Sequence, residues 1–197
     1  MSAEPHPALV IVRGNSGSGK TTTAREVRRR YGKRGCALIE QDHLRRVILR
    51  EHGGGGDDRI APGFITTMAQ TALDGGYHVI LEGILHTGQY GRALRTLIAG
   101  HGGSSTCFYM DVSFDETVRR HLRREEPIPV EPETMLGWYT PLDLLGVPGE
   151  LVIPETVGFD EVVTTILHGS GLVGAAPLSP CPTRCARCDL IRDRDCR

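Results

Sequence analysis

The chain has 197 residues, a net charge of −1 at pH 7, and basic residues interspersed with acidic ones. This length suits one domain with a substantial core, and the balanced charge argues against a sequence-wide surface for nucleic acid. Residues 1–12 contain no basic region and only five consecutive apolar residues, which argues against a signal peptide and a membrane span. We expect a cytoplasmic protein, monomeric or homodimeric, that binds neither nucleic acid nor membrane.

A glycine-rich segment, RGNSGSGKTT, follows the apolar run at residues 8–12. Its spacing fits the Walker A pattern, GxxxxGK followed by Ser or Thr, in which backbone N–H groups and the next helix hold phosphate oxygens. Lys20, one of two lysines in the chain, is expected to reach the β and γ phosphates, and Thr21 to bind Mg²⁺. The expected nucleotide-binding residues are Gly14, Asn15, Ser16, Gly17, Ser18, Gly19, Lys20, Thr21 and Thr22. The alternative is a glycine-rich turn without a ligand.

Apolar side chains at helical spacing predict a helix after this segment, with Ala24, Val27 and Tyr31 on its inner face and Gly32 at its end. Further strands are predicted at residues 36–40, 77–82, 106–112 and 151–153, and further helices at residues 42–51, 62–74, 89–99, 113–126 and 159–168. The inward faces are predicted to hold Leu44, Val47 and Ile48 in the helix at 42–51, and Phe64, Ile65, Met68 and Ala72 in the helix at 62–74. Strands that alternate with helices favour a parallel sheet between helix layers, with ligands at the carboxyl ends of the strands.

The order of these parts resembles the small P-loop kinases, namely gluconate and shikimate kinases, chloramphenicol phosphotransferase and the zeta-toxin sugar-nucleotide kinases, over residues 9–167. The segments RGNSGSGKTT, EQDHLRR, ILEGILH and DVSFDETVRRH are also similar to actinobacterial P-loop kinases. The resemblance implies a three-layer P-loop NTPase fold with a five-stranded parallel sheet in the order 2-3-1-4-5, a helical lid, and ATP with Mg²⁺ as cofactors. We expect a kinase domain at residues 1–168 and a flexible Gly/Pro linker and cysteine-rich tail at residues 169–197.

Asp42 directly follows the second strand, where related small-molecule kinases have the carboxylate that accepts the proton of the attacking hydroxyl. Asp42 is therefore the candidate general base and acceptor-binding residue, and the alternative is an N-cap for a helix that begins at His43. Arg45 is a candidate for binding an anionic group of the acceptor, or a residue of a solvated helix face.

Glu82 ends the strand YHVILE at the position of a Walker B acid, where a carboxylate assists Mg²⁺. A buried acid is costly unless a cation answers it, so Thr21 and Glu82 are the predicted metal ligands. Asp111, at the end of the next strand, is the rival. His86 lies in the loop after Glu82 and is a candidate for substrate contact or an exposed loop residue.

The sequence SFDE at residues 113–116 is a capping-box pattern that starts a helix with four arginines. We assign catalytic roles to Arg120 and Arg124, which would neutralise charge on the transferred phosphoryl group, and nucleotide contacts to Arg119 and Arg123. The alternative is a solvated face neutralised by neighbouring glutamates. Trp138, in LGWYTPLDLL, would line the acceptor pocket or pack in the core.

The tail contains Cys181, Cys185, Cys188 and Cys196, which would hold a structural zinc ion or belong to a segment without fixed structure. Cys36 and Cys107 fall in predicted strands and are expected to be buried without a chemical role.

These features favour an ATP-dependent phosphotransferase that moves the γ-phosphoryl group to a hydroxyl of a small molecule, such as a sugar, a nucleoside or an antibiotic-like acceptor. The alternatives are a P-loop ATPase that acts as a nucleotide switch, a sugar-nucleotide kinase toxin of the zeta type, and a non-catalytic binding module. Asn15 is the only asparagine in the chain, so the NKxD signature of GTPases is absent.

Overall fold

The computed structural model describes residues 6–51, 60–123 and 129–179. One parallel sheet lies at its centre, with the strand order β2-β3-β1-β4-β5, which confirms the predicted fold class. The strands are β1 (Leu9–Gly14), β2 (Cys36–Glu40), β3 (His78–Gly83), β4 (Ser105–Asp111) and β5 (Leu151–Pro154).

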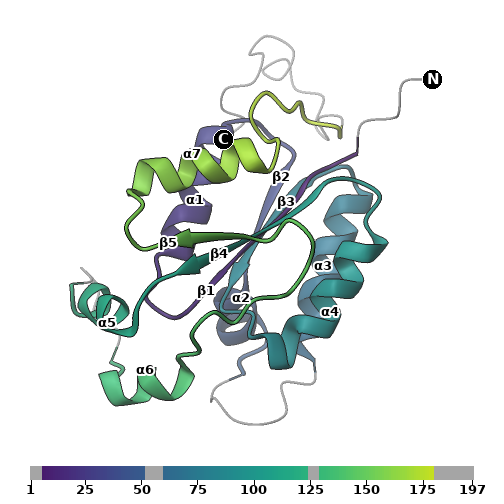
Figure 1. Cartoon of the computed structure of the whole chain (residues 1–197). Helices are drawn as coiled ribbons and strands as arrows, with labels where there is room; N and C mark the ends of the chain where they lie inside the picture. Colours follow the sequence, from purple (N-terminus) through teal and green to yellow (C-terminus); the bar gives the residue numbers. More distant parts are fainter. Residues whose placement is uncertain (1–5, 52–59, 124–128, 180–197) are drawn as a thin grey trace.

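Helices cover both faces of the sheet (Figure 1). On one face lie α1 (Lys20–Tyr31) and α7 (Phe159–Gly169), and on the other α3 (Ala61–Asp74) and α4 (Thr87–Gly100). Alternate side chains of β1 supply the two cores, because successive residues of a strand point to opposite faces. Val10 and Val12 belong to the core under α1 and α7, whereas Leu9 and Ile11 belong to the core under α3 and α4.

Two further helices, α5 (Phe114–Leu122) and α6 (Pro132–Trp138), lie apart from these layers (Figure 1). Residues 139–150 connect α6 to β5 without regular structure. Leu145 of this connection is 2 % exposed and packs in the core under α3 and α4. An irregular segment therefore helps to cover the sheet.

The helix expected at residues 42–51 is different in the structure. The chain forms α2 (Gln41–His43) and then a π-helical turn, η1 (Leu44–Ile48), in which the Leu49 N–H donates to the Leu44 carbonyl over 2.9 Å. Leu44 is buried, but Val47 and Ile48 are 59 % and 54 % exposed. The prediction of these two as inward residues is wrong, because hydrogen bonds between residues five apart give a wider turn than the α-helical spacing assumes.

The inner face of α3 also differs from the predicted one. The buried residues are Ala61, Ile65, Ala69 and Leu73, at a constant spacing of four. Phe64 and Ala72 are partly buried, and Met68 is 39 % exposed, so the prediction for Met68 is wrong. The small side chains of the two alanines let α3 approach the sheet closely, which places the adjacent methionine at the edge of the core.

Only half of the predicted capping box forms at α5. The Ser113 hydroxyl accepts from the Glu116 N–H over 3.4 Å, as predicted. The Glu116 carboxylate pairs with arginines of its own helix, and Glu155 accepts instead from the Ser113 N–H over 2.9 Å. Arg124 lies outside the described residues.

The packed chain continues past the expected domain boundary at His168. Leu172 is 1 % exposed in the core under α1 and α7. The Lys33 Nζ donates to the Ala175 carbonyl over 3.1 Å, and the Ala176 carbonyl lies 3.1 Å from His78 Nε2. Residues 170–179 therefore pack against the amino-terminal ends of β2 and β3.

Cys181, Cys185, Cys188 and Cys196 lie outside the described residues, which leaves the zinc hypothesis untested. In the ranges that the structure covers, no group of three or more His, Cys, Asp or Glu side chains is arranged to hold a metal ion. Cys36 and Cys107 are buried there with free thiols. No helix in these ranges is long and apolar enough to cross a membrane.

Candidate active site

The Walker A loop connects β1 to α1 and turns at its glycines. Gly17 has φ of 80°, and a Cβ atom at this position would lie 2.7 Å from the Thr117 carbonyl oxygen of α5. Only glycine fits so close to another backbone in this conformation. The loop then enters α1 at Lys20, so the first N–H groups of this helix lie beside the loop, as phosphate binding requires.

Two predicted metal ligands are in direct contact. The Thr21 Oγ1 donates to the Glu82 carboxylate and lies 3.1 Å from both of its oxygens. Glu82 is 2 % exposed, and burial raises its pKa, although the nearby charge of Lys20 and the Thr21 hydrogen bond oppose this shift. The Thr21 hydroxyl thus contacts Glu82 and not the rival Asp111. Lys20 Nζ lies 3.3 Å from the Asn15 carbonyl oxygen, within the same loop.

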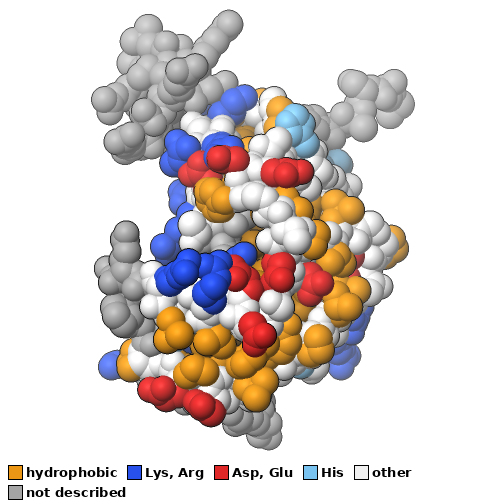
Figure 2. Space-filling model, turned by 60° about the vertical axis from the view of Figure 1, so that its left-hand side comes forward, with side chains coloured by type: hydrophobic (Ala, Val, Ile, Leu, Met, Phe, Trp, Pro, Cys, Tyr) orange, Lys and Arg blue, Asp and Glu red, His pale blue; other side chains and the backbone are white. Residues whose placement is uncertain are grey.

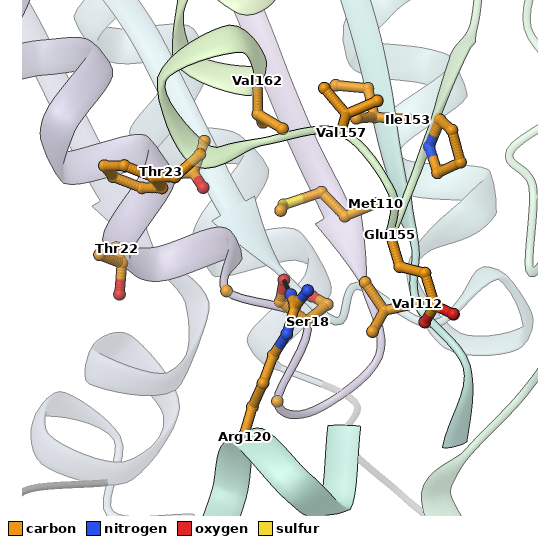
Figure 3. Close-up of a pocket in the computed structure, with 14 residues that line it drawn as sticks. Ser18, Thr22, Thr23, Met110, Val112, Arg120, Ile153, Glu155, Val157 and Val162 are labelled. Atoms are coloured by element: carbon orange, nitrogen blue, oxygen red, sulfur yellow. Dashed lines mark hydrogen bonds between the residues drawn. The ribbon is translucent and has the colours of Figure 1, made fainter. Parts of the chain in front are cut away.

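A pocket of about 380 Å³ opens beside the Walker A loop (Figure 3). Its walls are mostly apolar, with Met110, Val112, Ile153, Val157 and Val162 grouped on one side. Thr22 and Thr23 of α1 line it as well. A cleft of this size, with a few polar groups among apolar side chains, is typical of a small-molecule site.

Arg120 reaches from α5 toward the Walker A loop (Figure 3). Its Nη1 donates to the Ser18 carbonyl over 2.9 Å, and its Nε donates to Glu116 over 2.6 Å. Hydrogen bonds from Arg119 and Arg120 lower the pKa of Glu116 to about 2, so Glu116 stays ionised and holds Arg120 in place. Arg123 is exposed. Figure 2 shows Lys and Arg side chains gathered along the left-hand side of the view, with acidic side chains among them.

The structure places Asp42 in solvent. Its side chain is 63 % exposed and lies 3.6 Å from Arg46. The N-cap of α2 is Glu40, without a side-chain hydrogen bond, so the alternative of Asp42 as an N-cap is wrong. Asp42 lies two residues after Glu40, which pairs in register with Glu82 across β2 and β3. Arg45 is more enclosed, with 17 % exposure, and lies 3.8 Å from Glu51.

His86 and Trp138 are both partly buried. His86 caps α4: its Nδ1 accepts from the Gly88 N–H over 3.2 Å, and its Nε2 lies 3.0 Å from Thr140 Oγ1. Both ring nitrogens are therefore engaged within the protein. Trp138 is the last residue of α6. Contact of either residue with a substrate stays a prediction.

Sequence reasoning missed Arg13, which lies directly before the Walker A loop. Arg13 is 0 % exposed and pairs with Asp143 at 2.9 Å and Glu150 at 3.5 Å. It also donates to the Leu85 carbonyl over 2.9 Å and to the Thr87 hydroxyl over 2.8 Å. The sequence does place an arginine at the end of a strand that is expected to be buried on both faces. A buried charge needs partners, so this position could have indicated an ion pair.

Gln41 was also missed. It is 3 % exposed, and its Oε1 accepts from the Leu85 N–H over 3.0 Å. A Cβ atom on Gly83 would collide with this side chain, so the glycine after Glu82 permits the contact. Leu85 has φ of 45°, an unfavourable conformation for leucine, and Gln41 and Arg13 hold it there from both sides. The loop after Glu82 is therefore rigidly supported.

Two of three comparisons with known proteins find matches. The Zeta toxin family model matches residues 1–141. Comparison with curated protein sequences gives no match. The fold is similar to that of the APS kinase CysC of Mycobacterium tuberculosis, solved with AMPPNP and APS, at a TM-score of 0.67 and 20 % identity over 87 % of this chain and 99 % of that one.

Two further solved structures share the fold. A gluconokinase from Sinorhizobium meliloti has a TM-score of 0.59 and 17 % identity, with 86 % of this chain and 95 % of that chain covered. The tunicamycin resistance protein of Deinococcus radiodurans has a TM-score of 0.57 and 19 % identity, with 89 % and 99 % covered. Because the family model matches most of the sequence, the chain belongs to the Zeta toxin family, and its fold is that of small P-loop kinases.

Proposed function

We propose that this protein is an ATP-dependent phosphotransferase that moves the γ-phosphoryl group of ATP to a hydroxyl of a small molecule. The observation that carries the proposal is the contact between Thr21 of the Walker A loop and the buried Glu82, beside Lys20 and a pocket of about 380 Å³. The solved relative with AMPPNP and APS supports a nucleotide in this fold.

The donor set at this contact fits Mg²⁺. The hydroxyl of Thr21 and the carboxylate of Glu82 are oxygen ligands, which this ion prefers. Burial raises the pKa of Glu82, so its ionised form lacks sufficient stabilisation from the protein alone, and a cation would supply it. When bound, Mg²⁺ would offset negative charge on the β and γ phosphates.

The chain's own residues then have separate tasks. The backbone N–H groups of the Walker A loop and Lys20 would hold the phosphates, and Arg120, 2.9 Å from the Ser18 carbonyl, would neutralise charge that spreads over the transferred group. Asp42 would accept the proton of the acceptor hydroxyl as its oxygen bonds to the γ-phosphorus and the bond to ADP breaks. The exposure of Asp42 leaves it accessible to an acceptor.

The apolar pocket would receive the nucleoside of ATP. It lies beside Gly17, Ser18 and Gly19, so a nucleoside bound there has its phosphates at the Walker A loop. Met110 and Val162 offer apolar contacts for a base.

Labelled transfer tests the function directly. The protein is incubated with Mg²⁺, ATP labelled in the γ-phosphate, and pools of sugars, nucleosides and antibiotics. A labelled organic product in one pool, absent with Asp42→Asn although this variant still binds Mg·ATP, is the expected result. Transfer retained by Asp42→Asn removes Asp42 as the base, and phosphate release that only a protein partner stimulates favours a nucleotide switch.

A second candidate acceptor class is supported by the family match over residues 1–141. The zeta-toxin kinases act on sugar nucleotides, so a pool of sugar nucleotides belongs in the same assay. Arg45 lies three residues after Asp42 and offers a guanidinium group for the diphosphate of such an acceptor. A labelled product in this pool, with a KM for the acceptor that Arg45→Ala raises, identifies sugar nucleotides as the acceptor class. A labelled product only among neutral sugars excludes this class.

A further inference from the structure

The side chain of Asn15 faces the protein, although its backbone belongs to the Walker A loop. Asn15 is 5 % exposed. Its Oδ1 accepts from the Thr140 N–H over 3.0 Å, and its Nδ2 donates to the Thr140 carbonyl over 2.9 Å. Both ends of the amide therefore bind the backbone of one residue, Thr140, in the segment that follows α6.

Tyr109 of β4 reinforces this pairing. Its hydroxyl donates to the Thr140 carbonyl over 3.2 Å and accepts from Asn15 Nδ2 over 3.3 Å. The three groups form a largely buried network in which the hydrogen bonds support one another. Residue 140 is thus fixed to the Walker A loop and to β4 at once.

Tyr139, adjacent to Thr140, contacts the start of α5. The Tyr139 ring lies edge-on to Phe114, the first residue of α5, with ring centroids 5.5 Å apart. The Tyr139 hydroxyl donates to the Val112 carbonyl over 3.1 Å, just before α5 begins. A shift at residue 140 would therefore move the start of the helix that carries Arg120.

Arg120 connects α5 back to the Walker A loop, because its guanidinium donates a hydrogen bond to the Ser18 carbonyl of that loop (Figure 3). We propose that Asn15 is a positioning residue, which acts through Thr140, Tyr139 and α5 to set where the Arg120 guanidinium meets the phosphates. This inference rests on the proposed phosphotransferase function. It assigns the Asn15 side chain to the rate of phosphoryl transfer and not to the binding of nucleotide.

Asn15→Ala tests the assignment by comparing two measurements. Calorimetry gives the dissociation constant of Mg·ATP, and single-turnover cleavage of the γ-phosphoryl bond gives the rate, with water or any identified acceptor. We expect a rate about tenfold lower, as for a small misplacement of a catalytic group. The Mg·ATP dissociation constant is expected to change by less than about twofold, because the backbone of the loop still holds the phosphates.

A double-mutant cycle shows whether Asn15 acts through Arg120. Arg120→Ala is expected to lower the rate by about 10² or more. In that background Asn15→Ala is expected to add less than about twofold, because the group it positions is gone. Tyr109→Phe removes the supporting hydroxyl without substituting any residue of the Walker A loop. It is expected to lower the rate a few-fold alone and to have no effect beside Arg120→Ala.

Each other outcome overturns the inference. If Asn15→Ala weakens Mg·ATP binding as much as it lowers the rate, the substitution has only damaged the Walker A loop. If the rate losses of Asn15→Ala and Arg120→Ala multiply in the double variant, the two residues act independently. An unchanged rate shows that the side chain positions nothing. A wild-type protein that fails to bind or cleave Mg·ATP defeats the proposed function itself, a result distinguishable from these because it appears before any substitution.

Discussion

Arg13 and Asp143 form an ion pair of 2.9 Å across 130 residues of sequence, and their side chains are 0 % and 13 % exposed. The pair joins the strand before the Walker A loop to the irregular segment between α6 and β5. Glu150 supports it from the far end of the same segment, where its carboxylate also accepts from the Leu145 and Gly146 N–H groups. A buried charged network thus fixes the segment that Asn15 also contacts.

Arg13→Met is expected to lower the free energy of unfolding by about 3–5 kcal/mol, because it leaves Asp143 and Glu150 without their cation. Urea unfolding followed by circular dichroism measures the change. Arg28→Met, at an exposed position of α1, is the matched control and should cost less than about 0.5 kcal/mol. Equal effects of the two substitutions would show that the buried network contributes little.

The two lysines of the chain provide a second matched pair. Lys20→Ala is expected to lower turnover of Mg·ATP by about 10² or more, because the charge beside the β and γ phosphates is lost. Lys33→Ala removes the same charge at the Ala175 carbonyl and should leave turnover unchanged. A steady-state phosphate-release assay compares them, and normal turnover by Lys20→Ala contradicts a Walker A role for this loop.

Glu82→Gln is expected to stabilise the protein and to abolish Mg²⁺-dependent turnover at the same time. Burial raises the pKa of Glu82 above its ordinary value of 4.5, so the folded chain binds a proton that the unfolded chain has released between the two values. The free energy of unfolding therefore falls as pH rises through this window. Glutamine does not ionise, so the variant avoids this loss.

The test of Glu82→Gln compares urea unfolding of both proteins at pH 5 and pH 8, without nucleotide or Mg²⁺. The stability gain of the variant should be larger at pH 8 than at pH 5. Other titrating groups are common to both proteins and cancel in the difference. A gain that is equal at the two pH values, or a loss at pH 8, contradicts an uncompensated charge on Glu82.

Local patterns in the sequence predicted the parts of the fold that depend on near neighbours. The β-branched run before Gly14 and the glycine spacing around Lys20 identified β1 and the Walker A loop, and the strand order is confirmed. The prediction of Met68 as an inward residue is wrong because it considers the apolar character of the side chains in α3 and not their size. The stripe that packs runs through Ala69, whose small side chain permits close approach.

Contacts between distant residues account for what the sequence did not predict. The acidic partners of Arg13 lie 130 and 137 residues away, and the partners of the Asn15 side chain lie 94 and 125 residues away. No periodicity within a window of one helix or strand encodes such pairs. The sequence likewise does not predict the π-helical turn η1, because the spacing of the apolar residues Leu44, Val47 and Ile48 also fits an α-helix.

The packing of the glycine-rich sequence after His168 also depends on contacts with residues that are distant in the sequence. The residues at helical spacing from Leu172 include no large apolar side chain, only Ala175 and Ala176, yet Leu172 is 1 % exposed against the core under α1 and α7. Leu172→Ala is expected to lower the free energy of unfolding by about 3 kcal/mol, because it removes a buried side chain and leaves a cavity. Val173→Ala, at a neighbouring residue with 52 % exposure, should change it by less than about 0.5 kcal/mol. Thermal and urea unfolding measure both variants, and a Leu172→Ala protein as stable as Val173→Ala would show that residues 170–179 add no packing energy to the domain.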